Sequence, residues 1–174
     1  EFLKLAKNNK SYKQALNKIT EKRGLFINKK CFHKKDYIIF GILNITPDSF
    51  SDGGDFMSED NAFMKAKAML NDGADYIDIG GESTRPGASL IKDSEEILRV
   101  LPIIQKLNNE KIDISLDTRN SSTMKLGILS GVSIINDVSA LNNDNESINV
   151  IKNYDVPIIL MHMPGTPKNM MEKN

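Results

Sequence analysis

The sequence has no tryptophan, one cysteine and two histidines, and each scarcity narrows the class of protein. Because Cys31 is the only cysteine, an intrachain disulfide is impossible, and we assign Cys31 no role in chemistry. No Cys/His cluster has the spacing that a structural zinc ion requires. This cysteine usage fits a reducing, cytoplasmic compartment best.

An excess of one charge sign and a long apolar run are also missing. Lys+Arg and Asp+Glu both number 23, so no net field favours nucleic acid or an anionic membrane as a partner. The longest apolar run, residues 37–43, is interrupted by Gly41 and falls well short of the roughly 20 residues that span a bilayer. We therefore expect one soluble packed domain, with small-molecule chemistry left open.

Five short segments rich in β-branched and apolar residues predict strands that are buried on both faces, as in a parallel sheet. These segments are residues 37–44, 74–81, 111–118, 132–139 and 156–163. Helical patterns separate them, at residues 59–70, 93–107, 121–130 and 145–153. Pro102 predicts a kink or a break in the second helix, and Gly131 predicts the end of the third. The alternation indicates an α/β protein of βαβ units, and periodicity leaves both a barrel and an open sheet possible.

The first 35 residues differ from the rest and read as an N-terminal helical extension or linker. We expect a helix over residues 4–22 and an optional hairpin around residues 25–32. His33 lies among charged residues and is interpreted as solvated surface.

Polar residues gather where the predicted strands end. They are Asn44, Asp78, Asp117 and Asn136. Ligands of parallel α/β proteins bind at the carboxyl ends of strands. Each buried polar group costs several kcal/mol unless it is paired, so a polar ligand explains the repetition, although each residue alone fits a helix cap or a turn equally well. The Asn44 oxygen suits Mg²⁺ shared with substrate phosphates, and Asp117 and Asn136 suit the edge of a flat heterocycle.

Two long motifs, residues 41–54 and 77–87, closely resemble the signature regions of the dihydropteroate synthase family. Shorter blocks at residues 115–118, 135–138 and 160–167 resemble the same family in the same order. The resemblance implies a (β/α)8 TIM barrel, of which residues 36–174 supply about the first five strands. It also implies the condensation of 7,8-dihydropterin-CH₂ diphosphate with p-aminobenzoate, with Mg²⁺ as cofactor and diphosphate as the second product.

The resemblance further implies the residues of each subsite. Pterin would be bound by Asp78, Asp117 and Asn136, with Ile42, Val138 and one of Met161 or Met163 packing on its faces. Core packing is an equally good interpretation of these apolar residues. Diphosphate would contact Asn44 and Thr84, and Asn44 would also bind the metal. The p-aminobenzoate site would comprise Phe50, Ser83, Thr84, Arg85 and Pro86.

Catalytic roles follow for Asp52 and Arg85, the former stabilising positive charge that develops on the pterin methylene. The loops at residues 46–54 and 83–87 resemble a mobile pair that closes over the second substrate. His162 is more often a core group than a catalytic one at such a position, and we interpret Asp137 as a supporting residue.

Members of the resembled family continue for three more strand–helix units. We therefore expect this chain to be a fragment, or one piece completed by another segment, and poorly stable alone because a half barrel leaves a sheet edge unpaired. A homodimer of the full-length form and a fusion to another folate enzyme are expected as partners. Two other functions stay open: a pterin-binding methyltransferase of the same barrel family, and a non-catalytic pterin-binding fragment.

Overall fold

The computed structural model describes residues 26–27, 30–31, 37–46, 59–83 and 90–161. The chain divides into two compact units, residues 1–37 and 38–174. In the first unit, strands β1 (Phe26–Ile27) and β2 (Lys30–Cys31) pair antiparallel, which confirms the hairpin predicted around residues 25–32. The helix predicted over residues 4–22 lies outside the described residues.

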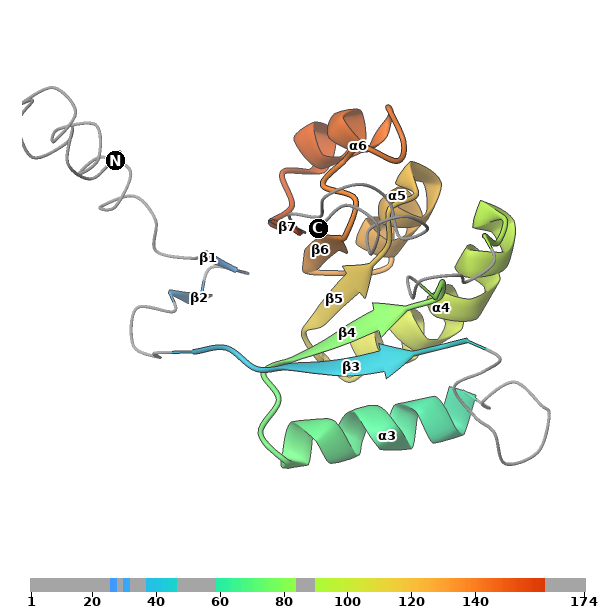
Figure 1. Cartoon of the computed structure of the whole chain (residues 1–174). Coiled ribbons are helices and arrows are strands. Elements are labelled where there is room, and N and C mark those ends of the chain that lie inside the picture. Colours follow the sequence, from blue (N-terminus) through green and yellow to red (C-terminus); the bar gives the residue numbers. More distant parts are fainter. Residues whose placement is uncertain (1–25, 28–29, 32–36, 47–58, 84–89, 162–174) are drawn as a thin grey trace, which may run out of the picture. The chain divides into compact units, whose positions relative to one another are not determined.

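The second unit contains five parallel strands in the order of the sequence, β3-β4-β5-β6-β7 (Figure 1). Their bounds are β3 (Phe40–Asn44), β4 (Tyr76–Gly80), β5 (Ile114–Asp117), β6 (Ile134–Asp137) and β7 (Ile158–Leu160). Each strand lies inside a segment that its apolar residues predicted. The parallel α/β class expected from the sequence is therefore confirmed.

Four helices alternate with these strands, also as predicted. They are α3 (Glu59–Asn71), α4 (Asp93–Asn109), α5 (Ser121–Leu129) and α6 (Ser147–Tyr154). The prediction of a break at Pro102 was wrong, since α4 runs through this residue. Proline leaves the carbonyl of Leu98 without its helical donor, but Leu98 is 76% exposed, so this side of the helix faces water that can replace the donor.

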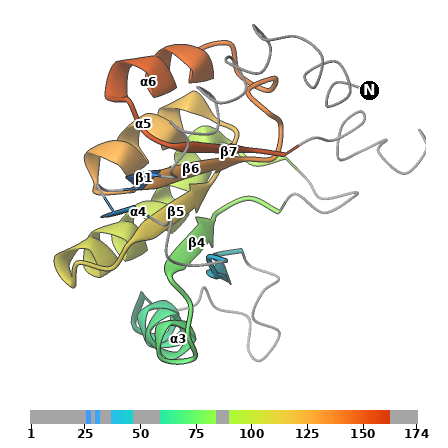
Figure 2. The same cartoon turned by 90° about the vertical axis from the view of Figure 1, so that its left-hand side faces the viewer.

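The winding of the chain distinguishes between the two architectures that periodicity left open. Figure 2 shows the helices α3, α4, α5 and α6 along one face of the sheet. An open doubly wound sheet reverses its strand order at a switch point and covers both faces with helices. Sequential strand order with all helices on one face is the winding of a barrel.

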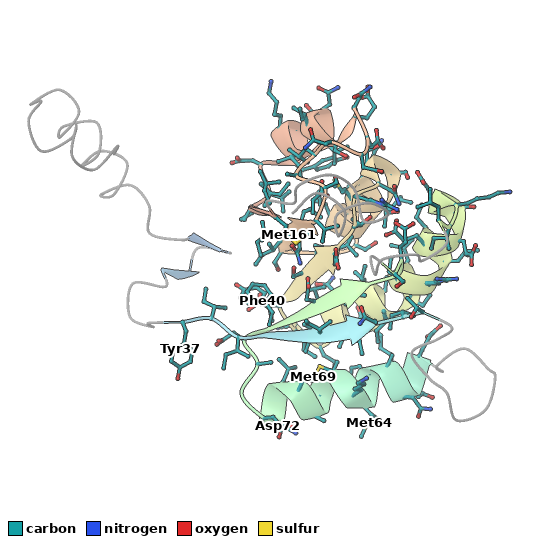
Figure 3. All side chains as sticks on the ribbon, viewed as in Figure 1. Tyr37, Phe40, Met64, Met69, Asp72 and Met161 are labelled. Carbon is teal, nitrogen blue, oxygen red and sulfur yellow. The ribbon has the colours of Figure 1, made fainter. Side chains whose placement is uncertain are left out.

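The hydrophobic core fills the space between the strands and the helices. Leu43, Ile79, Leu116 and Ile135 are successive partners in register, and each is 0% exposed. Figure 3 shows Met69 between α3 and β3, whereas Phe40 lies on the opposite face of β3. There Phe40 stacks on Tyr76 with 5.3 Å between ring centroids. The two faces of the sheet thus have different roles, one packing helices and one carrying the polar groups described below.

Burial on both faces holds for the inner strand β4 and was wrong for the two outer strands β3 and β7. Every residue of β4 is buried, whereas Ile42 on β3 is 62% exposed and Leu160 on β7 is 50% exposed. Within the described sheet, β3 and β7 each pair with only one other strand, which leaves their outer sides uncovered. In the same part of the chain, no helix has the length and apolar character needed to cross a membrane.

A left-handed residue follows each of the helices α3 to α6, and α3, α4 and α5 also share the same hydrogen-bonded turn. Gly73 after α3 and Gly131 after α5 have φ values of 109° and 105°, which confirms the stop predicted at Gly131. After α4 the same position is occupied by Lys111 with φ 59°. The amide of Ile112 donates to the carbonyl of Leu107 across this turn at 3.2 Å. Lys111 therefore adopts a conformation that suits glycine better.

Candidate ligand-binding site at the carboxyl ends of the strands

A single row of residues crosses the sheet at the carboxyl ends of four strands. Asn44 pairs in register with Gly80, Gly80 with Asp117, and Asp117 with Asn136. Residues paired in this way project from the same face of a parallel sheet. The structure therefore brings Asn44, Asp117 and Asn136 together on the face opposite the helices, as the sequence predicted. We call the four register partners Asn44, Gly80, Asp117 and Asn136 the rim row.

Gly80 is the member of the rim row that has no side chain, and its absence leaves space between two functional groups. A Cβ atom on Gly80 would lie 3.3 Å from Oδ1 of Asn44 and 3.7 Å from Oδ2 of Asp117. The Asn44 amide oxygen and the Asp117 carboxylate thus flank a position that only glycine leaves open. A ligand group can approach the backbone of β4 there.

Asp78 lies one step below the rim row on the same face of β4, and Asn136 reaches it. The Asn136 amide nitrogen donates a 3.0 Å hydrogen bond to Oδ2 of Asp78, whose side chain is only 6% exposed. Within the described part of the chain, Oδ1 of Asp78, Oδ1 of Asp117 and the hydroxyl of Ser115 have no hydrogen-bond partner. Buried polar atoms are nearly always paired, so these three are available to a polar ligand.

Asp117 is the most perturbed titratable group of this face. Burial raises its pKa to about 7, and the negative charges of Asp78, Glu96, Asp137 and Glu82 add to the effect in that order. Near neutral pH the Asp117 carboxyl therefore changes charge readily. In the ionised state it accepts hydrogen bonds with both oxygens, and in the protonated state it also donates one.

The residues predicted to pack on the pterin differ in position and exposure. Ile42 pairs in register with Asp78 on the same face and is 62% exposed. Val138 is half-buried in the turn after β6. Met161 follows β7 and is 41% exposed (Figure 3). Of these three residues, Ile42 is the one that the sheet register places directly beside Asp78.

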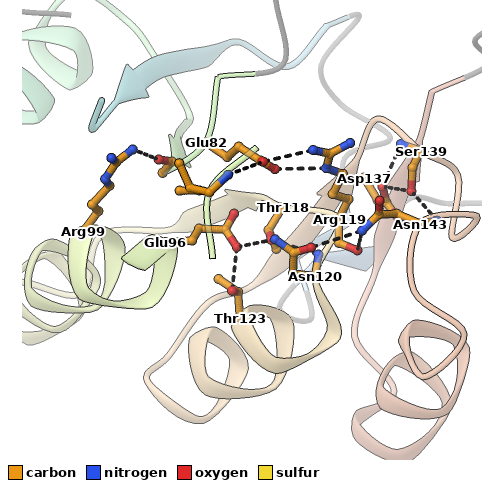
Figure 4. Close-up of polar contacts among 12 residues, drawn as sticks. Glu82, Glu96, Arg99, Thr118, Arg119, Asn120, Thr123, Asp137, Ser139 and Asn143 are labelled. Carbon is orange, nitrogen blue, oxygen red and sulfur yellow. Dashed lines mark hydrogen bonds and ion pairs between the residues drawn. The ribbon is translucent and has the colours of Figure 1, made fainter. Parts of the chain in front are cut away.

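An ion pair that sequence reasoning missed joins two residues that follow the rim row in the chain. Arg119 donates from Nε to Oε2 of Glu82 and from Nη2 to Oε1, both at 2.9 Å (Figure 4). Glu82 follows β4 and Arg119 follows β5, so the pair joins the segments that leave two adjacent strands. Glu82 was visible in the sequence as an acidic residue after a strand, but nothing local connected it with a residue 37 positions away.

A second missed group centres on Glu96 in the first turn of α4. Glu96 is 0% exposed and accepts hydrogen bonds from Asn120 at 2.9 Å and Thr123 at 2.6 Å. Burial raises its pKa, against the effect of these donors. Asn143 donates to Asn120 at 3.1 Å. An acidic residue at the start of a helix looks ordinary in a sequence, which explains why Glu96 was overlooked.

Asp137 has a structural role, in agreement with its interpretation as a supporting residue. Its carboxylate accepts hydrogen bonds from the amide and hydroxyl of Ser139, both at 2.7 Å, and from the amide of Leu141 at 2.9 Å. These bonds stabilise a turn in which Ala140 and Leu141 have φ values of 53° and 63°. Asp137 therefore fixes the backbone that follows Asn136.

Several predicted site residues lie outside the described part of the chain. They are Phe50, Asp52, Thr84, Arg85, Pro86, His162 and Met163. Of the predicted p-aminobenzoate site, only Ser83 is described, as a half-buried residue next to Glu82. Among the described residues, no group of three or more His, Cys, Asp or Glu side chains is arranged to bind a metal by itself.

A barrel-wound α/β domain with carboxylates and carboxamides at its carboxyl strand ends is a small-molecule-binding domain. Residues 40–174 match the family described as pterin binding enzymes, and the chain belongs to this family.

Individual relatives support the same assignment. The dihydropteroate synthase of Bacillus subtilis is 47% identical over 131 residues, which are 75% of this chain and 46% of that protein. The folate synthesis bifunctional protein of Arabidopsis thaliana is 45% identical over 147 residues, 82% of this chain and 30% of that protein. The chain thus spans about half the length, or less, of the curated relatives it matches.

A solved dihydropteroate synthase from Clostridium difficile, determined in the presence of pteroic acid, superposes with a TM-score of 0.70 at 46% identity. The match covers 79% of this chain and 56% of that one. The TIM-barrel fold class implied by the sequence is therefore confirmed, with strands β3 to β7 supplying part of the barrel.

Proposed function

We propose that this chain supplies the pterin-binding part of a dihydropteroate synthase, which joins 7,8-dihydropterin-CH₂ diphosphate to p-aminobenzoate and releases diphosphate. The rim row carries the proposal, because Asp117 and Asn136 are register partners on the face opposite the helices and Asn136 also binds Asp78. A pterin is a flat heterocycle with donors and acceptors along its edge, which complements this set of groups. The names of the relatives agree with this choice of reaction.

Recognition of the pterin rests on three polar residues and on apolar packing. Asp117 in its ionised form accepts hydrogen bonds from ring and amino N–H groups, and the unpaired Oδ1 of Asp78 accepts another. The Asn136 amide has two N–H donors and an acceptor oxygen, and one of the donors is already directed at Asp78. Ile42, Val138 and Met161 are proposed to pack against the faces of the ring.

Mg²⁺ is proposed to bind through Asn44 together with diphosphate oxygens. The donor chemistry fits a shared site, because the Asn44 amide oxygen is a hard ligand at the open position beside Gly80. Among the described residues no cluster of three His, Cys, Asp or Glu side chains is arranged around a metal, so the proposed site includes diphosphate oxygens as ligands. When bound, Mg²⁺ would neutralise charge on the departing diphosphate. Thr84 is proposed to contact the same diphosphate.

The second substrate is assigned to residues that the family resemblance indicates. Phe50, Ser83, Thr84, Arg85 and Pro86 are proposed to surround p-aminobenzoate, with Arg85 pairing its carboxylate. Asp52 is proposed to stabilise positive charge on the pterin methylene. These roles depend on sequence motifs, and the position of Ser83 directly after Glu82 is the structural observation that accompanies them.

The proposed reaction is a dissociative substitution at the pterin methylene. The bond between the methylene carbon and the diphosphate oxygen breaks, and its electron pair leaves with diphosphate. The amine nitrogen of p-aminobenzoate then donates its lone pair to the carbon, and the resulting ammonium loses a proton. By resemblance, the loops at residues 46–54 and 83–87 are proposed to exclude water from the cation until the amine attacks. Because diphosphate leaves before the amine attacks, the proposed reaction needs no covalent enzyme nucleophile.

Partners beyond the substrates are proposed on different grounds. A fusion to another enzyme of folate synthesis is supported by the Arabidopsis relative, whose name describes a bifunctional protein. A homodimer of the full-length form is proposed from the family resemblance.

The decisive experiment follows product formation by the complete protein that carries this sequence. Incubation with pterin diphosphate, p-aminobenzoate and Mg²⁺ should yield equal amounts of dihydropteroate and diphosphate. Methyltetrahydrofolate with a corrinoid acceptor is the matched control, and methyl transfer without dihydropteroate formation would assign the chain to the methyltransferase branch. Calorimetry with pteroic acid on the same sample identifies the third outcome, binding without turnover.

A further inference from the structure

The Glu82–Arg119 pair occupies a particular place relative to the rim row. Glu82 lies two residues beyond Gly80, and Arg119 lies two residues beyond Asp117, so the pair joins the chain segments that leave two adjacent members of the row. The side chains of Glu82 and Arg119 are only 5% and 13% exposed. Two parallel N–H···O bonds fix both distance and orientation, which a single contact does not.

The segment after Asp117 is held from several directions at once. The amide of Thr118 donates to the carbonyl of Asn136 at 3.1 Å, which attaches it to β6. Asn120 donates to Glu96 on α4 at 2.9 Å and accepts from Asn143 at 3.1 Å (Figure 4). Through its side chain, Arg119 links this segment to Glu82 at the end of β4. On the β4 side, the pair thus adds a side-chain link next to the backbone pairing of Asp117 with Gly80.

The pair also controls charge near Asp117. The charged groups that act on Asp117 are Asp78 on β4, Glu82 after β4, Glu96 on α4 and Asp137 on β6, all of them acidic. Arg119 forms an ion pair with one of these carboxylates. Arg99, whose side chain is 8% exposed, pairs with Glu95 and donates a 2.8 Å hydrogen bond to the carbonyl of Gly81. Removal of either partner of the Glu82–Arg119 pair changes the local charge by one unit, in opposite senses.

We propose that Glu82 and Arg119 are positioning residues for the pterin-binding carboxylate, holding Asp117 in place and setting the charge around it. This role rests on the proposed function and deepens it. Neither residue is assigned a contact with substrate. An ion pair that serves stability alone would affect folding but would leave the titration of Asp117 unchanged.

The test titrates the Asp117 carboxyl by ¹³C NMR in the complete, ligand-free protein, with Asp117→Asn identifying its signal. Glu82→Gln leaves Arg119 unpaired, which favours ionised Asp117 and should lower the midpoint by about half a pH unit. Arg119→Gln leaves Glu82 unpaired and should raise the midpoint by about the same amount. The double variant should return it close to the wild-type value. Shifts of the same sign, or none, would overturn the proposal.

Geometry is tested separately from charge by Arg119→Lys, which retains the cation and loses the planar fork. We expect the midpoint to stay near that of wild type while the affinity for pteroic acid falls several-fold. For Glu82→Gln the matched control is Glu110→Gln, which removes a carboxylate from the exposed pair with Lys67 at 3.7 Å and should leave the Asp117 midpoint unchanged. Unchanged affinity in Arg119→Lys would refute the positioning role.

Folding and substrate binding are checked so that each result can be interpreted. Circular dichroism at each pH verifies that every variant is folded. If Arg119→Gln does not fold, the proposal is tested by whether the double variant reverses the midpoint shift of Glu82→Gln. The midpoint is measured without ligand. If the variants have the wild-type midpoint while wild-type protein binds pteroic acid, only the role of the Glu82–Arg119 pair is refuted. Wild-type protein that neither binds pteroic acid nor turns over substrates refutes the proposed function and this role together.

Discussion

The side-chain amide of Asn136 donates a 3.0 Å hydrogen bond to Asp78 although the two residues are 58 positions apart. Asp78 lies on β4 and Asn136 on β6, so the bond crosses β5, which lies between these strands. The two residues therefore behave as one unit on the ligand face. Several measurable consequences follow from this bond and its surroundings.

Asn136→Asp should replace the hydrogen bond by repulsion between two carboxylates. We expect the variant to be less stable than wild type at pH 8 by about 1–3 kcal/mol, and the difference to narrow at pH 5 as one carboxyl protonates. Urea unfolding at both pH values measures this. The double variant Asp78→Asn/Asn136→Asp restores one amide and one carboxylate, and should recover most of the stability. Equal stability of Asn136→Asp and wild type at pH 8 would show that the bond is unimportant.

Gly80→Ala should damage the ligand site more than the fold. The added methyl group would lie 3.3 Å from Oδ1 of Asn44 and 3.7 Å from Oδ2 of Asp117, and overpacking of this kind costs about 1–3 kcal/mol. We expect calorimetry to show about tenfold weaker binding of pteroic acid. Gly41→Ala is the control, since its methyl group would meet Met69 at 2.9 Å on the helix side of the sheet. That variant should lose stability and retain affinity; the reverse pattern would contradict the assignment of the two faces.

Asp117 should make the protein less stable as pH rises toward neutrality. Its pKa is about 7 when folded, against an ordinary value of 3.8, so the folded state retains a proton that the unfolded chain has released. Between pH 5.5 and 8 the resulting loss is at most about 2 kcal/mol. Asp117→Asn should lack this contribution, as measured by the difference in urea unfolding between the two proteins. Glu96 also has a raised pKa and acts with the same sign, but it is present in both.

Asn44→Ala should raise the Mg²⁺ requirement without preventing pterin binding. Loss of one amide oxygen removes a proposed metal ligand, so the Mg²⁺ concentration for half-maximal turnover should increase about tenfold. Affinity for pteroic acid, which has no diphosphate, should stay within error of wild type in the presence of EDTA. An unchanged Mg²⁺ dependence would remove Asn44 from the proposed metal site.

Lys111→Gly should stabilise the protein. Lys111 has φ 59° at the end of α4, a conformation that costs a residue with a side chain about 1 kcal/mol or more. After the entropy of glycine is subtracted, we expect a gain of roughly 0.5–1 kcal/mol in the free energy of unfolding. Gly73→Ala at the equivalent position after α3 has φ 109° and open space around it, so it should show the opposite effect through backbone strain alone.

Some long-range contacts had no signal in the sequence. The amide of Ser121 at the start of α5 donates to Asp144 at 3.0 Å, so a loop 23 residues away provides the cap that Asn120, the residue preceding the helix, does not. Hydrogen bonds from Ser121 and from the amide of Glu146 lower the pKa of Asp144. Local rules that seek a cap in the adjacent residue cannot find a donor–acceptor pair of this kind.

The sequence by itself determined the strands, the helices and the residues of the rim. Apolar runs and glycine stops act over a few residues, and Asn44, Asp117 and Asn136 were identifiable because parallel strands place their carboxyl ends at one edge. Only the tertiary structure decided the open position at Gly80, the hydrogen bond across β5 and the Glu82–Arg119 pair. These features depend on strand order and register, which bring together side chains whose spacing along the chain carries no periodic signal.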